Sequence, residues 1–317
     1  MILFILKRVL YTLPITFAVS IVCFLLVHLA PGDPVSAFLP PQASAEVIAA
    51  VTHELGLDRP LPIQFLHWLS RVVVGDFGVS IANGRDVFDE VIGAFSNSLI
   101  LASVAIPLAV AFGFALGAIS GYCRGTLVDR ISTVVAIGGV SVPHYWLAIV
   151  LVIIFAVENN ILPAMGAGPG DSRAWSWDWE HLRFAVLPAV SMAVVPMSII
   201  ARTVKAVVAE VLSQEFVRAL RAKGIGSFRV FIHVVKNAAP TSIAVVGVQV
   251  GYLLGGSILI ETVFSWPGAG YLLNIAIFQR DLPILQGTIL VLAMFFVFTN
   301  LLVDVLQAAI DPRVRRY

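Results

Sequence analysis

Six long apolar runs limit what this chain can fold into more than any other feature of its sequence. A helix of about 17–25 residues crosses a hydrocarbon core of roughly 30 Å. The runs that meet this length are 9–30, 99–121, 131–157, 185–201, 241–263 and 287–309. Hydrophobic residues make up 59% of the chain and charged residues 12%, against about 45–50% and about 25% in soluble domains. The sequence therefore predicts an all-α integral membrane protein with six transmembrane helices.

The first run follows Lys7 and Arg8, as the apolar core of a secretory signal would. It is longer than the roughly 7–15 residues of such a core, and no clear small-x-small cleavage site follows it. We interpret it as an uncleaved first helix.

Prolines interrupt several of the runs, at Pro107, Pro143, Pro188 and Pro196. A membrane-spanning helix tolerates proline where neighbouring helices satisfy the freed backbone groups. The prolines therefore favour a packed bundle over isolated spans.

Basic residues predict the orientation, because loops rich in Lys and Arg stay in the cytoplasm. With the N-terminus inside, the cytoplasmic segments hold fourteen of the twenty basic residues: Lys7, Arg8, Arg124, Arg130, Arg202, Lys205, Arg218, Arg221, Lys223, Arg229, Lys236, Arg313, Arg315 and Arg316. The outside holds Arg59, Arg71, Arg85, Arg173, Arg183 and Arg280. Without the long first outer loop the ratio is fourteen to three. We expect a multi-pass protein of a bacterial-type inner membrane, with both termini cytoplasmic.

These spans divide the chain into an N-terminal start with the first helix (1–30), an extracytoplasmic loop (31–97), a five-helix core (98–310) and a cytoplasmic tail (311–317). In the loop, Ser44 is a suitable N-cap, and the apolar residues that follow recur at helical spacing until Gly56. A second helix is predicted over 63–74. We expect a partly helical subdomain on the outer surface of the bundle. The alternative is an amphipathic helix lying in the membrane interface.

The longest cytoplasmic segment, 202–239, is also the most basic. Within it, 215–223 is predicted to form a short helix with an acid at its start, bases toward its end, and Gly224 as its stop. A second amphipathic stretch covers 228–236, and Pro240 introduces the fifth span. A partner that grips such a short helix would move the spans on both sides of it. The alternative is an ordinary interfacial helix in a positive-inside loop.

The residues of this segment resemble the cytoplasmic signature of the permeases of binding-protein-dependent ABC importers, in the variant of the dipeptide, oligopeptide and nickel branch. The matching residues are Phe216, Val217, Arg218, Leu220, Arg221, Ala222, Lys223 and Gly224, with Asn237 and Pro240 downstream. Leu220 departs from the pattern, which usually has a small residue there.

Further motifs of the B-type permease of this branch follow in order along nearly the whole chain. They are Ala30 to Pro34, Leu55 to Pro60, Gly75 to Ser80, Glu261 to Gly270, Arg280 to Pro283, and Asp311 to Arg313. The chain is therefore similar to the B-type permease over most of its length.

The resemblance implies a type I importer fold and the function of a membrane-spanning subunit that translocates di- or oligopeptides delivered by a binding protein. Alternative substrates in the branch are nickel complexes, glutathione, haem and oligosaccharides. The implied partners are a second related permease, two cytoplasmic ATPase subunits, an extracytoplasmic solute-binding protein and the lipid bilayer, with no nucleic acid. ATP and Mg are expected in the ATPase subunits and no cofactor in this chain. The implied ATPase-coupling residues are Glu215, Phe216, Val217, Arg218, Ala219, Leu220, Arg221, Ala222, Lys223 and Gly224.

Polar residues inside the bundle are the candidates for other roles, because charges in a membrane are costly. Glu261 either lines the outer mouth of a pathway or braces the turn over 264–270. Asp304 either pairs with a basic residue at the inner surface or contacts substrate. Gly255, Gly256 and Trp266 complete the possible pathway or gate. The two cysteines, Cys23 and Cys123, have no disulfide or metal-binding pattern, so we expect no metal.

Two other function classes are alternatives to the importer. An ion-driven secondary transporter usually has internal repeats with paired broken helices, and the sequence has no convincing repeat. An intramembrane enzyme would need a catalytic motif, and neither HExxH nor G-x-S-x-G occurs. The phosphate-binding loop G-x-x-x-x-G-K-[ST] is also missing from the sequence. The chain is therefore predicted to be a transport subunit without catalytic activity of its own.

Overall fold

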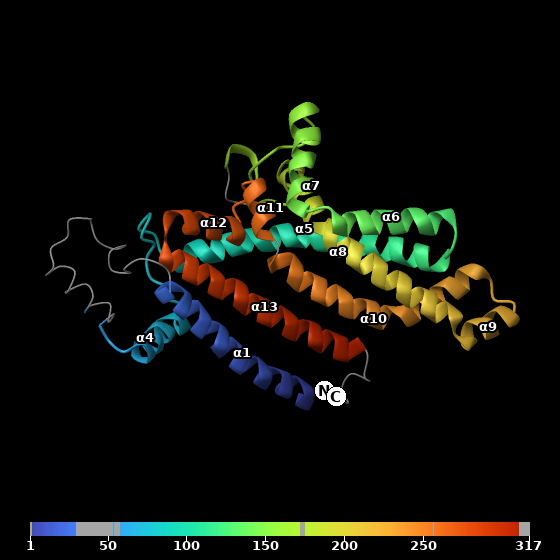
Figure 1. Ribbon diagram of the computed structural model, residues 1–317, viewed down its shortest axis with the longest axis horizontal. Coiled ribbons are helices and arrows are strands. Elements are labelled where there is room, and N and C mark those ends of the chain that lie inside the picture. The colour runs from blue at the N-terminus through green and yellow to red at the C-terminus, as the bar shows by residue number, and fades with distance from the viewer. Residues whose placement is uncertain (1, 30–52, 54–57, 172–174, 256, 311–317) are drawn as a thin grey trace.

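A computed structural model describes residues 2–29, 53, 58–171, 175–255 and 257–310 of the chain (Figure 1). The regular elements within these ranges are helices, and the one extended pairing is a bridge between Val79 and Asp86. The helices are α1 (Ile2–Leu29), α4 (Leu61–Val73), α5 (Val87–Tyr122), α6 (Leu127–Ser141), α7 (His144–Leu151), α8 (Trp179–Ser213), α9 (Glu215–Ala222), α10 (Ser227–Gly255), α11 (Ser257–Val263), α12 (Ala269–Gln279) and α13 (Leu282–Ile310). A π-helix, η1 (Val152–Glu158), continues α7, and η2 (Pro169–Asp171) is a single 3₁₀ turn.

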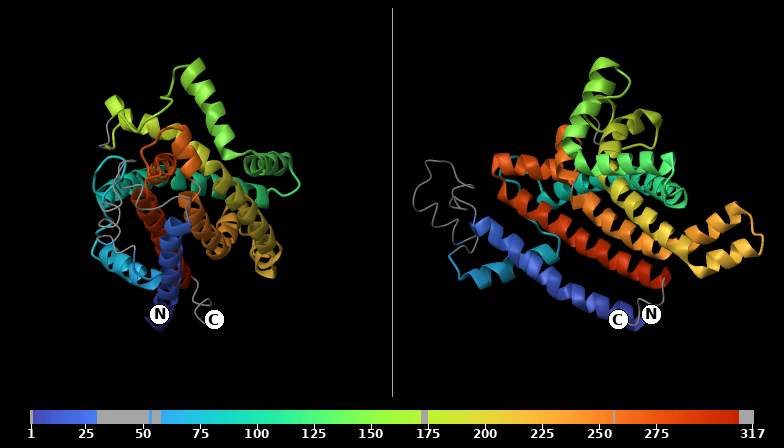
Figure 2. Two further views of the ribbon diagram at one scale, coloured as in Figure 1. Left: turned by 60° about the vertical axis from the view of Figure 1, so that its left-hand side comes forward. Right: turned by 45° about the vertical axis from the view of Figure 1, so that its right-hand side comes forward.

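Five helices, α1, α5, α8, α10 and α13, are long and apolar enough to cross a membrane. The pair made of α6 and α7 with η1 adds a sixth crossing if it is counted as one bent span. The long helices lie side by side, with α9 at one end of the bundle and α12 at the other (Figures 1 and 2). The predicted all-α membrane fold with six spans is confirmed.

The third span bends by 101° between Ser141 and His144. Val142 is extended, with φ −88° and ψ 124°, and Pro143 precedes α7. Proline disfavours helical geometry in the residue before it and has no N–H for the helix ladder. The sequence predicted an interruption at Pro143 but not a bend of this size. Pro107, by contrast, lies inside α5, which continues through it.

The fifth span differs from its predicted bounds of 241–263. Helix α10 begins at Ser227 and runs without a break through Pro240 to Gly255. The amphipathic stretch predicted over 228–236 and the fifth span are therefore one helix, and the prediction that Pro240 introduces the span is wrong. Helix α10 packs against α8 and α13, and membrane helices tolerate proline where they have such neighbours. Gly255 ends α10, and Gly256 lies outside the described residues.

Helices α5 and α8 form the closest packed pair of the bundle. Glycines recur along one face of α5 at Gly113, Gly117 and Gly121. A Cβ atom at Gly117 would lie 2.5 Å from the carbonyl oxygen of Ala201, and one at Gly121 would lie 2.8 Å from that of Lys205. Small residues at this spacing let two membrane helices approach backbone to backbone. We infer that α5 and α8 form one rigid unit.

Helix α4 follows the part of the outer loop that lies outside the described residues and packs on α1. Its buried Phe65 contacts Phe17 and Phe24, with ring centroids 5.7 and 5.5 Å apart. In the last turn of α4, the Arg71 guanidinium donates to Asp76 at 2.8 Å and lowers the pKa of that carboxyl group. The helix predicted over 63–74 is confirmed, whereas the one predicted after Ser44 lies outside the described residues.

Candidate functional site

The short helix α9 lies in the turn between α8 and α10, at one end of the bundle (Figure 1). Gln214 is extended, with φ −71° and ψ 150°, and separates α9 from α8. Beyond the other end, Gly224 has φ +73°, and its N–H donates to the carbonyl of Arg221 at 3.0 Å. A residue with positive φ is the usual way to end a helix with its last carbonyls satisfied. The predicted helix and its predicted stop at Gly224 are both confirmed.

One face of α9 is fixed to the long helices on either side. Val217 is buried, and Phe216 and Leu220 pack beside it. They contact a cluster from α8 and α10, which we call the elbow cluster: Val204, Val208, Val211, Val230, Val234 and Ala238. Leu220, which departs from the family pattern, therefore packs into this cluster. Any rigid movement of α9 must carry α8 and α10 with it, because packed interiors deform little.

The other face of α9 is basic and open. Arg218, Arg221 and Lys223 have exposed side chains, whereas Val217 is 1% exposed. The helix therefore presents positive charge outward from an apolar anchor. This arrangement suits an acidic or polar groove on a partner protein.

A polar network that the sequence did not predict links α8 to the hairpin of α5 and α6. The Nζ atom of Lys205 lies 2.5 Å from Oδ1 of Asp129 and donates to Oγ1 of Thr133 at 2.7 Å. Asp129 also accepts from the hydroxyl of Ser120 at 2.6 Å and from the N–H of Gly125 at 2.9 Å. The sequence shows Lys205 only as one of the basic residues of the cytoplasmic segments. The sequence also shows Asp129, the acid in the first turn of α6. It does not show that Asp129 pairs with Lys205, 76 residues later.

Glu261 belongs to a second buried network at the opposite end of the bundle. Its side chain is fully buried and accepts from the Ser98 hydroxyl at 2.7 Å and from the N–H groups of Gly270 and Tyr271 at 2.7 and 3.1 Å. It thereby caps the N-terminus of α12, where Gly268 has no side chain to do so. Of the two predicted roles for Glu261, this geometry is that of a brace for the turn over 264–270.

Trp266 completes the same network. It is fully buried, and its Nε1–H donates to the carbonyl of Asn97 at 2.9 Å. The Asn97 amide donates in turn to the carbonyl of Pro267 at 3.0 Å. Contributions of Trp266, Gly255 and Gly256 to a pathway or gate remain predictions.

Asp281 fixes the outer loop to the corner between α12 and α13. Its buried carboxylate accepts from the Ser80 hydroxyl at 2.5 Å and from the N–H groups of Ala82 and Ile284 at 3.2 and 3.3 Å. Ser80 and Asp281 belong to two motifs that are far apart in the sequence, and the fold brings them into contact.

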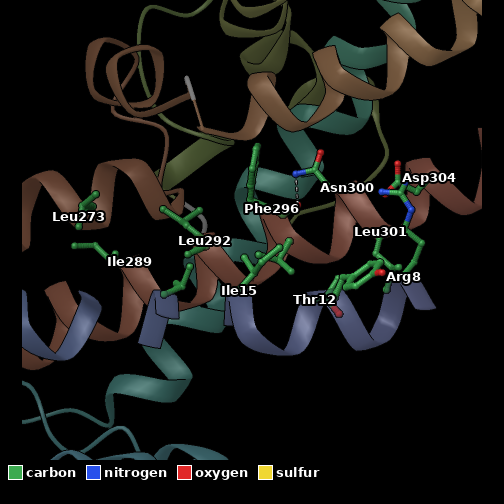
Figure 3. Close-up of a pocket in the computed structure, with 14 residues that line it drawn as sticks. Arg8, Thr12, Ile15, Leu273, Ile289, Leu292, Phe296, Asn300, Leu301 and Asp304 are labelled. Atoms are coloured by element: carbon green, nitrogen blue, oxygen red, sulfur yellow. Dashed lines mark hydrogen bonds and ion pairs between the residues drawn. The ribbon is translucent and has the colours of Figure 1, made fainter. Parts of the chain in front are cut away.

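Asp304 pairs with Arg8, as the first of its two predicted roles requires. The Nη1 atom of Arg8 lies 2.7 Å from Oδ2 of Asp304, across the gap between α1 and α13 (Figure 3). The pair closes one end of a groove of about 620 Å³ whose walls include Ile15, Leu292 and Phe296. The ion pair therefore joins the first helix to the last.

Two family descriptions match this architecture. Residues 113–316 match the inner membrane component of binding-protein-dependent transport systems, and residues 1–102 match the N-terminal part of the membrane component of such systems. The chain belongs to this permease family. It is thus a multi-pass inner-membrane subunit of an ABC importer, and its role is transport rather than catalysis.

The relatives support the same assignment over the full chain. The glutathione transport system permease protein GsiC of Escherichia coli strain K12 is 40% identical over 313 residues, which cover 98% of each chain. The protein of the same name from Shigella dysenteriae serotype 1 has the same identity and coverage. Among solved structures, the inward-facing MetNI methionine ABC transporter has a chain with a TM-score of 0.52 and 16% identity. That match covers 71% of this permease and 96% of the other chain, and it supports the type I importer fold.

Breaking the Lys205–Asp129 pair in this permease is expected to reduce transport. Lys205→Met removes the charge and leaves the carboxylate of Asp129 without its cation, so α6 loses a tie to α8. We expect uptake by the assembled transport system to fall about ten-fold, measured in membrane vesicles at equal permease content. Lys205→Arg keeps the cation beside Asp129 and should retain most of the activity. Full uptake in Lys205→Met would contradict a role for the pair.

Proposed function

We propose that this permease translocates short peptides, with glutathione as the first candidate, in an ATP-driven importer. The observation that carries the substrate class is its 40% identity, over 98% of both chains, to permeases named for glutathione transport. Glutathione is itself a tripeptide, so it falls within the class of di- and oligopeptides. Nickel complexes, haem and oligosaccharides are the alternative cargoes.

The importer would contain a second related permease, two cytoplasmic ATPase subunits that hold ATP and Mg, and an extracytoplasmic binding protein. The basic face of α9 would be the contact with an ATPase subunit, through Glu215 to Gly224. Both termini and α9 would then lie in the cytoplasm, in agreement with the fourteen-to-three ratio of basic residues. The outer loop and α12 would face the binding protein.

The proposed mechanism is alternating access. Closure of the ATPase dimer on ATP would move α9, and the elbow cluster would transmit that movement to α8 and α10. Because α5 packs backbone to backbone on α8, it would follow as part of the same rigid unit. The cavity would then open toward a loaded binding protein, and ATP hydrolysis would reset it.

The first experiment is a mild-detergent pull-down of this chain from native membranes, with mass spectrometry of the proteins that accompany it. We expect a second six-span permease, one or two ATPases with phosphate-binding loops, and a binding protein. ATP-dependent uptake of radiolabelled glutathione and dialanine by vesicles containing that complex then tests the substrate class. A chain that purifies alone, stable and folded, would contradict the importer and favour an ion-driven transporter.

A further inference from the structure

The groove between α1 and α13 has one polar end (Figure 3). The ion pair of Arg8 and Asp304 closes it there, and Thr12 and Asn300 line it one helical turn further in. This is also the end of the bundle at which α1 begins and α13 ends (Figure 1). The polar groups are therefore gathered at the membrane surface rather than along the groove.

The rest of the groove is apolar and faces away from the bundle. Its walls come from α1, α12 and α13 and include Ile15, Val19, Leu273, Leu292 and Phe296. Ile15 and Phe296 are each 50% exposed. Helices α1 and α13 are also the least buried of the five long helices. In a bilayer, such a surface is covered either by acyl chains or by another protein.

The length of the groove is that of one membrane leaflet. Arg8 and Val19 are eleven positions apart on α1, and Ile289 and Asp304 are fifteen apart on α13. At 1.5 Å per residue these distances are about 16 and about 22 Å. One leaflet has about 15 Å of hydrocarbon, or about 20 Å with its headgroups, whereas a helix that crosses both leaflets covers about 30 Å. The groove therefore fits a lipid better than a transmembrane helix.

The polar end of the groove is positively charged. Lys7 is exposed beside Arg8, and 42% of the Arg8 side chain stays exposed next to Asp304. A guanidinium group has five N–H donors and suits contact with a phosphate as well as with a carboxylate. Three further arginines follow the end of α13 in the sequence: Arg313, Arg315 and Arg316.

Acids offset only part of this charge. The first twelve and the last eighteen residues of the chain together hold these five bases and two acids, Asp304 and Asp311. Basic clusters at the end of a membrane-spanning helix, and basic pockets between such helices, attract lipids with anionic headgroups. The charge of this end therefore favours an anionic lipid over a neutral one.

We propose that this groove binds one anionic phospholipid, with an acyl chain along Ile15, Leu292 and Phe296 and the phosphate at Lys7 and Arg8. Among the described helices, α1 contacts the bundle mainly through α13. A lipid that touches both helices binds only while α1 lies on α13, so it stabilises that attachment. The proposal does not depend on which substrate the importer carries.

Photo-cross-linking of the wild-type complex tests the site directly. The complex is placed in phosphatidylcholine nanodiscs that contain a trace of phosphatidylglycerol with a diazirine in one acyl chain. After illumination, we expect mass spectrometry to find the label mainly on residues 8–19 of α1 and 289–304 of α13. Added unlabelled phosphatidylglycerol should lower this labelling at least five-fold, and the same amount of additional phosphatidylcholine should lower it less than two-fold.

A pair of substitutions on α13 tests the groove itself. Ala293→Phe places a ring among the residues that line the groove and leaves the ion pair in place. Leu302→Phe places the same ring at a position that is 47% exposed and lies outside the lining of the groove. We expect labelling to fall at least five-fold in Ala293→Phe and to stay within two-fold of wild type in Leu302→Phe. Lys7→Gln should raise the amount of phosphatidylglycerol needed for half-maximal competition at least three-fold.

Even labelling of all exposed spans would overturn the site, because it would show only ordinary contact with the bilayer. Equal competition by phosphatidylcholine would overturn the choice of an anionic headgroup. If α1 and α13 carry no label in the assembled complex, the second permease covers the groove and the proposal is wrong. The competition is measured on the wild-type complex, so it decides the question even where Ala293→Phe fails to assemble.

Discussion

Replacing Gly224 with proline is expected to reduce uptake by the importer at least about 100-fold while the permease remains in the membrane. Gly224 has φ +73°, whereas the proline ring holds φ near −65°. Proline also removes the N–H that donates to the carbonyl of Arg221. The end of α9 would lose its geometry, and Leu220 would be displaced from the elbow cluster. The measurement is ATP-dependent uptake in vesicles, normalised to permease content by immunoblot.

Gly224→Asn is the matched control, because asparagine tolerates positive φ better than other residues with a side chain. We expect this variant to retain most of its uptake. Reversing charge with Arg218→Glu and Arg221→Glu tests the open face of α9 separately, since both side chains are exposed and Val217 stays packed. This double variant should also lose uptake at normal membrane content. Normal transport in both Gly224→Pro and the double variant would exclude α9 as the coupling helix.

Replacing Glu261 with leucine is expected to destabilise the permease by about 3 kcal/mol or more. The buried carboxyl group accepts from Ser98, Gly270 and Tyr271, and each buried donor left without its acceptor costs about 1–3 kcal/mol. Leucine would leave these donors buried and unsatisfied. We expect a lower thermal unfolding temperature of the purified complex, read from intrinsic fluorescence, and a smaller amount of permease in the membrane.

Two milder variants calibrate this result. Glu261→Gln keeps one acceptor oxygen and should cost less than the leucine variant. Ser98→Ala removes a single donor to the carboxylate and should cost the least, although it also removes the acceptor for the Ala269 N–H. A leucine variant as stable as wild type would show that the turn over 264–270 is held by packing of Trp266 rather than by Glu261.

The two ends of the bundle thus have different physical designs. At the α9 end, apolar packing joins a basic helix to two long helices, and the Lys205–Asp129 pair extends the connection to α6. At the α12 end, buried acids accept hydrogen bonds from backbone N–H groups. Glu261 accepts from the start of α12, and Asp281 accepts from the outer loop. The first end is suited to transmit motion and the second to resist it.

The sequence by itself determined the six spans, the short helix at Glu215–Ala222 and its stop at Gly224. Each of these depends on residues within a few turns of one another, such as an apolar run of sufficient length or a glycine after a basic turn. For Asp304 it left two roles open, pairing with a basic residue at the inner surface or contact with substrate, because an acid in a membrane is costly and needs a reason.

Only the tertiary structure decided which groups meet. Arg8 was one of several bases that could have paired with Asp304, and Lys205 had no predicted partner at all. Pro143 bends its span by 101°, whereas α10 continues through Pro240. Proline removes the same backbone bond at both sites, and the surrounding helices determine whether the span bends or stays straight. Contacts such as Ser98 with Glu261, 163 residues apart, depend on how whole helices pack, which no local pattern specifies.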